Sequence, residues 1–142
     1  MRIRNTSKIY SIEQIRKIIH FVRPSGISNF DVMIKNSGDS FWAGGAYVKG
    51  SYYHSLSSNP FITLRVGKIK MPFIYSPFRA GYLPWECFTQ EEFLVHLIAH
   101  ELRHLWQQVH PRGWRVWGSR GQFSERDADA YAIHKVREWR RK

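Results

Sequence analysis

The chain has 142 residues, of which 43% are hydrophobic and 15% aromatic, a composition that excludes a disordered protein and favours one folded domain over residues 1–142. Its single cysteine, Cys87, excludes an internal disulfide, and the lack of a secretory signal or a long apolar run favours a cytoplasmic protein without membrane contacts. The formal net charge of +11 suggests attraction to polyanions such as nucleic acid, unless it only keeps an aromatic-rich chain in solution.

Residues 1–10 form a basic segment that we expect to be a tail, and the first helix follows it. Isoleucine and valine recur at helical spacing over residues 11–22, and Ser11 precedes them as a candidate N-cap. Pro24 and Gly26 then favour the end of the helix. The N-terminal part therefore predicts one amphipathic helix.

Three strands are predicted after this helix, and they suggest a small, mostly antiparallel sheet. Each segment is rich in β-branched, aromatic or small apolar residues, and turn residues separate the segments. The predicted strands span residues 30–35, 41–48 and 61–66. Residues 67–88 are rich in proline, glycine and aromatic side chains and predict irregular structure.

Two long helices are predicted in the C-terminal third of the chain. Thr89 and Glu92 form a T-x-x-E capping box ahead of the first helix, which ends before Pro111. The second helix begins at about Ser124, a favourable N-cap residue, and ends in a basic tail at 140–142. The order of elements predicts an α+β fold with an N-terminal helix, a small sheet and two C-terminal helices.

The first of these two helices contains the motif H-E-x-x-H. His100 and His104 lie on one helical face, because four steps of about 100° return to within about 40° of the starting direction. Two imidazoles so placed can bind one zinc ion, and Glu101 can flank the ion and take a proton from a water molecule there. The motif predicts a zinc-dependent hydrolase; the alternative is a chance match on a charged, amphipathic helix.

A catalytic zinc ion usually has three protein ligands, and two residues compete for the third position. His110 follows His100 by ten positions, the spacing of the metzincin pattern H-E-x-x-H-x-x-G-x-x-H. However, Gln107 replaces the glycine of that pattern, and no methionine follows residue 71 to form the accompanying turn. Glu125, at the start of the last helix, is the favoured candidate, and His110 is the alternative.

The segment 125–129 has the form E-x-x-A-D and resembles the gluzincins, the thermolysin-like group of zinc peptidases, in particular the Ste24- and HtpX-like peptidases and the minimal gluzincins. This resemblance implies that Glu125 is a zinc ligand and that Asp129 holds one of the two histidines through its other ring nitrogen. It also implies a zincin-like fold and the hydrolysis of peptide bonds. One helical turn separates Glu125 from Asp129, which places both on one face.

The first half of the chain resembles the front of SprT-like metallopeptidases and other zincins. The order of helix, strands and H-E-x-x-H helix carries this resemblance, together with AGGAYV before FITLRV. It implies that an edge strand pairs with an extended peptide, and Gly44 and Gly45 would let that backbone approach closely, unless they form an ordinary bulge. The chain differs from SprT-like proteins in lacking their zinc-ribbon cysteines and in its glutamate as third ligand. A role in DNA–protein crosslink repair is therefore disfavoured.

The remaining candidate residues have structural explanations. His96 precedes His100 by one turn and is expected to pack near the site, since one straight helix cannot supply three ligands to one ion. His134 is on the opposite face of its helix from Glu125 and is expected at the surface. Cys87 is expected to be buried rather than to bind the metal as a thiolate.

Three functions compatible with these observations differ in class. The leading hypothesis is a zinc metallopeptidase that acts on a peptide or protein substrate. The second is a basic protein that binds nucleic acid and keeps a zincin fold without turnover. The third is a regulator like the H-E-x-x-H proteins paired with phage-type repressors, which would cleave a single protein partner.

Overall fold

In the part of the chain that the structure describes, the elements follow in the order strand, helix, five strands and two helices. The computed structural model describes residues 1–27, 29–47, 59–77, 81–109 and 122–142. The elements are β1 (Ile3–Asn5), α1 (Ile12–Val22), β2 (Asp31–Asn36), β3 (Trp42–Tyr47), β4 (Phe61–Val66), β5 (Phe73–Tyr75), β6 (Trp85–Cys87), α2 (Gln90–Val109) and α4 (Gln122–Arg140). The predicted α+β class is confirmed, as are the three predicted strands, whose ends shift by one residue at most.

The main sheet is mixed, which corrects the expectation of a mostly antiparallel one. Its strand order is β1-β2-β4-β3, in which β1 pairs parallel with β2 and β2 parallel with β4. Only the pairing of β3 with β4 is antiparallel. The reason is topological: α1 forms a crossover between β1 and β2, and β4 inserts between β2 and β3 instead of extending a meander. As a result, β3 is an edge strand.

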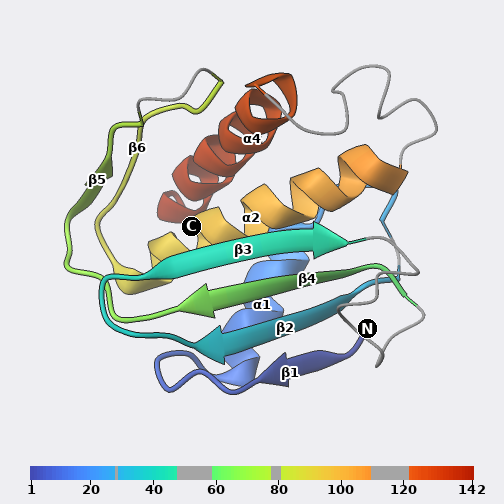
Figure 1. The fold of residues 1–142 in the computed structure, drawn as a ribbon, viewed down its shortest axis with the longest axis horizontal. Helices are drawn as coiled ribbons and strands as arrows, with labels where there is room; N and C mark the ends of the chain where they lie inside the picture. Colours follow the sequence, from blue (N-terminus) through green and yellow to red (C-terminus); the bar gives the residue numbers. More distant parts are fainter. Residues whose placement is uncertain (28, 48–58, 78–80, 110–121) are drawn as a thin grey trace.

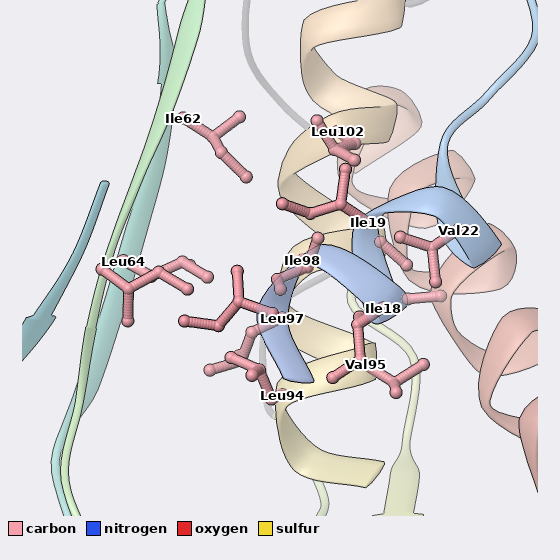
Figure 2. Close-up of a cluster of buried hydrophobic side chains, with 14 of the residues drawn as sticks. Ile18, Ile19, Val22, Ile62, Leu64, Leu94, Val95, Leu97, Ile98 and Leu102 are labelled. Carbon is pink, nitrogen blue, oxygen red and sulfur yellow. The ribbon is translucent and has the colours of Figure 1, made fainter. Parts of the chain in front are cut away.

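Helices α1 and α2 cover one face of the sheet, and α4 packs on the side of α2 away from the sheet (Figures 1 and 2). Figure 2 shows Ile62 and Leu64 of β4 pointing toward apolar residues of α1 and α2. Because α2 is covered on two sides, even its polar residues Glu92, His96 and Glu101 are buried. Buried polar groups need partners, and Glu92 has the guanidinium of Arg140 as one of them.

Two helix starts follow the sequence prediction, and a third differs from it. The Ser11 hydroxyl accepts a hydrogen bond from the Gln14 N–H, and the Thr89 hydroxyl accepts one from the Glu92 N–H, both at 3.1 Å. The Glu92 carboxylate reaches the N–H of residue 88 instead of that of Thr89, so only half of the capping box forms. Helix α4 begins at Gln122, and Ser124 therefore lies inside the helix instead of capping it.

Two segments that were predicted to be irregular contain strands. Residues 3–5, expected within a basic tail, form β1 along the outer side of β2. Within residues 67–88, β5 and β6 form a two-stranded antiparallel ribbon. Its aromatic side chains Phe73 and Trp85 pack against Phe93 of α2, with ring centroids 5.1 and 5.6 Å away. Three-residue strands are too short to show a periodicity, which explains why the sequence did not indicate them.

The described helices include none whose length and apolar character would allow it to cross a membrane.

Candidate metal centre

Helices α2 and α4 bring His100, His104 and Glu125 together. The two Nε2 atoms of the histidines lie 3.1 Å apart. Glu125 places Oε2 at 3.3 Å from Nε2 of His100 and Oε1 at 3.1 Å from Nε2 of His104. These three residues form a group that could hold a metal ion.

The size of this group fits a small, tetrahedrally coordinated cation. Two ligand atoms that are each about 2.0–2.1 Å from an ion, at a tetrahedral angle, are about 3.3 Å apart. The two Nε2 atoms are 3.1 Å apart, and each has a different oxygen of Glu125 at a similar distance, Oε2 at 3.3 Å from His100 and Oε1 at 3.1 Å from His104. Two imidazole nitrogens and one carboxylate oxygen are also the ligand types that zinc accepts.

The electrostatics of the group favour a positive charge between the three residues. Burial lowers the pKa of His100, but its contacts with Asp129 and Glu125 outweigh this effect and raise the pKa to about 10. Burial also lowers the pKa of His104, and the contact with Glu125 again reverses the direction. Conversely, burial raises the pKa of Glu125, whereas the two histidines bring it well below its usual range. Protons on the imidazoles would therefore compete with a metal cation for this site.

Asp129 lies behind His100, on the side away from Glu125. Its Oδ1 is 2.8 Å from Nδ1 of His100, although this oxygen lies off the direction of the ring N–H. Its Oδ2 accepts a hydrogen bond from the N–H of Leu83 at 3.0 Å, and the residue is 2% exposed. A fixed carboxylate at this position favours a proton on Nδ1 and leaves Nε2 directed toward the candidate ion.

Glu101 lies beside the group without joining it. Its Oε1 is 3.9 Å from Nε2 of His100, and the residue is 8% exposed. Burial raises the pKa of the Glu101 carboxyl, while the neighbouring histidines lower it, and the balance lies above its usual value. Gly44 of β3 backs onto this carboxylate, since a Cβ atom at Gly44 would lie 2.9 Å from Oε1 of Glu101. The strand and the carboxylate are therefore in close contact.

Gln107 is a site residue that the sequence indicated only as a departure from the metzincin pattern. Its side-chain oxygen lies 3.0 Å from Nδ1 of His104, and the residue is 5% exposed. A signal for this role exists in the sequence, because Gln107 follows His104 by three positions on the same helical face. This spacing alone does not assign the role, because the role also depends on α4 covering that face of α2.

The other histidines and the cysteine behave largely as expected. His96 is buried and its ring stacks on Trp85, with centroids 3.6 Å apart. With His100 and Asp129 it forms a second group that could hold a metal ion, but its Nε2 is 3.9 Å from the Asp129 carboxylate. His134 is exposed and pairs with Glu138 at the surface, and Cys87 is buried. His110 lies outside the described residues.

The chain matches no protein-family model, no curated protein and no solved structure. The fold and the site define an α+β protein with a candidate metal centre between helices α2 and α4.

Proposed function

We propose that the protein is a zinc-dependent metallopeptidase in which His100, His104 and Glu125 hold the metal and Glu101 is the general base. One observation supports this most strongly: the two Nε2 atoms of α2 lie 3.1 Å apart, each has a carboxylate oxygen of Glu125 at 3.1–3.3 Å, and the buried carboxylate of Glu101 lies beside them. The arrangement has the features of a zincin-like site. Its test is hydrolysis of a fluorescently labelled unfolded protein, which should require zinc and stop when a chelator removes it.

The proposed chemistry depends on the position and protonation of Glu101. Zinc held in such a site would act as a Lewis acid and would lower the pKa of a water molecule bound there toward about 7. Glu101 accepts a proton from the attacking water and delivers it to the nitrogen of the leaving amine. A carboxylate whose pKa is raised by burial is a stronger base than an exposed one and accepts the proton of water more readily.

Edge strand β3 is the proposed place for the substrate backbone. The Phe41 carbonyl accepts a hydrogen bond from the Gly67 N–H, on the side of β3 that faces β4. The Ala46 carbonyl accepts one from the side-chain amide of Gln108, on the opposite side of the strand. Because backbone groups alternate in direction along an antiparallel edge, those of Gly44 point to the open side, next to Glu101. An extended peptide can add to such an edge as a further strand. Peptide or protein is therefore the proposed substrate class.

Replacing Gly44 with alanine should reduce hydrolysis on the order of 10²-fold, because an added Cβ would displace the general base. This Cβ would lie 2.8 Å from Cδ2 of Leu64 and 2.9 Å from Oε1 of Glu101. The measurement is the rate of peptide hydrolysis together with the zinc content, which should stay the same. Gly45→Ala is the matched control, since its Cβ would meet the Tyr47 hydroxyl on the opposite face of the sheet. Equal activity of both variants would contradict the role of the close contact between Gly44 and Glu101.

A second candidate function, binding of nucleic acid, is favoured by the charge on the outer face of the sheet. Lys35 and Arg65 lie directly opposite each other in the β2–β4 register, and both are exposed. They point away from the core, because Ile34 and Leu64 next to them point into it. Directly opposed like charges destabilise a sheet, so an anionic partner would relieve the repulsion. In Figure 1 the described helices all lie behind this face.

The double variant Lys35→Glu/Arg65→Glu should weaken binding to a single-stranded DNA oligonucleotide and flatten its salt dependence. Loss of two phosphate contacts lowers the slope of log K against log salt by about 1.4. Fluorescence anisotropy at several salt concentrations measures this slope. Arg16→Glu/Lys17→Glu on the exposed side of α1 carries the same charge change and is the control. If both double variants lose the same affinity for the oligonucleotide, the net charge of the protein attracts the DNA and the outer face of the sheet is not a specific binding surface.

A further inference from the structure

The side chain of Gln107 connects three groups on two helices. Its oxygen Oε1 lies 3.0 Å from Nδ1 of His104. Its nitrogen Nε2 donates hydrogen bonds to the carbonyl of Ser124 and to Oδ2 of Asp127, each at 3.0 Å. Gln107 is 5% exposed, so it makes these contacts away from water. Such a buried amide is held in one orientation by its partners.

The partners of Gln107 determine which tautomer His104 adopts. A backbone carbonyl and a carboxylate only accept hydrogen bonds, so the amide nitrogen must face Ser124 and Asp127. The amide oxygen must then face His104, and because this oxygen also only accepts, the imidazole proton belongs on Nδ1. In the neutral imidazole that binds a metal, the other ring nitrogen, Nε2, then has its lone pair directed toward His100 and Glu125.

Asp127 is itself held in place by Arg103. The guanidinium donates to both carboxylate oxygens of Asp127, at 2.7 and 3.2 Å. It also lies over the ring of Trp106, 3.8 Å from the ring centroid. A bidentate pair with a stacked guanidinium fixes the carboxylate more firmly than a single contact. The chain of contacts therefore runs from Arg103 through Asp127 and Gln107 to His104.

We infer that Gln107 is a positioning residue, which sets the tautomer of His104 and the place of Glu125 for metal binding. The second effect follows from its bond to the Ser124 carbonyl, which belongs to the peptide unit directly before Glu125. One amide thus aligns a ligand on α2 with a ligand on α4. The inference rests on the proposed function, and it assigns to an uncharged amide the role that Asp129 has for His100.

Gln107→Met tests this inference, because methionine keeps the length and burial of the side chain and loses both polar groups. We expect the zinc affinity, measured by competition with a chelating dye, to fall 10- to 100-fold. In the cobalt-loaded protein the visible absorption bands should shift, since the ligand geometry changes. Val136→Ala, a buried truncation in α4, should lower the melting temperature without altering zinc affinity or the cobalt spectrum.

Gln107→Glu separates the acceptor role of Gln107 from its donor role. A carboxylate still accepts the Nδ1 proton of His104, but it cannot donate to the Ser124 carbonyl or to Asp127. The ring ¹⁵N shifts of this variant should therefore keep the proton on Nδ1, while its zinc affinity falls below that of wild type. Zinc binding by Gln107→Met equal to that of wild type would overturn the inference. The ring ¹⁵N shifts of His104 in the zinc-loaded wild type give a test without any substitution, and a proton on Nε2 would also overturn it. If wild type binds no zinc, the proposed function fails first.

Discussion

Replacing Glu101 with glutamine should leave zinc bound and reduce peptide hydrolysis by about 10²- to 10⁴-fold. Glutamine has nearly the same shape, but its amide cannot accept the proton of the attacking water. The carboxyl is 8% exposed and its pKa is raised by burial, so a neutral amide also suits the surroundings. The folded structure should therefore persist. The measurement combines the rate of hydrolysis with elemental analysis of the purified protein.

Glu91→Gln is the matched control for this experiment. Glu91 lies on the same helix but bonds to Gln14 and Trp139, away from the candidate ion. It should keep both zinc and activity. Hydrolysis by Glu101→Gln at the wild-type rate would exclude Glu101 as the general base, and with it the proposed mechanism. Loss of zinc together with activity would show that Glu101 acts as a ligand.

Replacing Glu125 with alanine should lower zinc affinity more than 100-fold. Loss of a residue that only hydrogen-bonds to a metal ligand lowers the affinity roughly 10- to 100-fold, and loss of a ligand itself should have a larger effect. Glu125 supplies both oxygens that face the histidines, at 3.3 and 3.1 Å. Without them, two imidazoles face each other with no opposing charge. Chelator competition and elemental analysis measure the loss. Glu138→Ala on the same helix is the control, because Glu138 pairs with His134 at the surface.

The affinity for zinc should also depend on pH in a defined direction. Without metal, contacts with Asp129 and Glu125 raise the pKa of His100 to about 10, so a proton competes with the metal at neutral pH. Zinc affinity should rise with pH, and binding should release protons. By the same shift, His100 stabilises the metal-free fold fully below pH about 6.5 and loses this contribution as pH rises toward 10.

A His110→Ala variant that loses zinc while Glu125→Ala keeps it would instead assign the third ligand to His110.

Local patterns in the sequence predicted the elements whose signals lie within one turn or one strand. Ser11 and Thr89 cap α1 and α2 as expected, because a cap depends on residues three positions away. The spacing of His100 and His104 predicted their shared face for the same reason. The approach of Glu125 was suggested by a family resemblance, and the packing of α4 on α2 agrees with it.

The parts that could not be predicted depend on contacts between distant segments. The direction of strand pairing follows from β1, which is too short to be recognised, and from the insertion of β4 between β2 and β3. The role of Gln107 depends on Ser124 and Asp127, which are brought near it by helix packing alone. No periodicity within a segment contains such information.

The composition of β3 has a consequence for self-association. An exposed strand edge can template the addition of further copies of a chain, and proteins usually protect such edges. Here the edge carries the run Ala43 to Ala46, alanine and glycine only, which are poor strand formers with little side-chain surface to hold a neighbour. The backbone groups of this edge are therefore available to a peptide that binds transiently. The small side chains give little contact area to a second copy of the chain, which limits aggregation along β3.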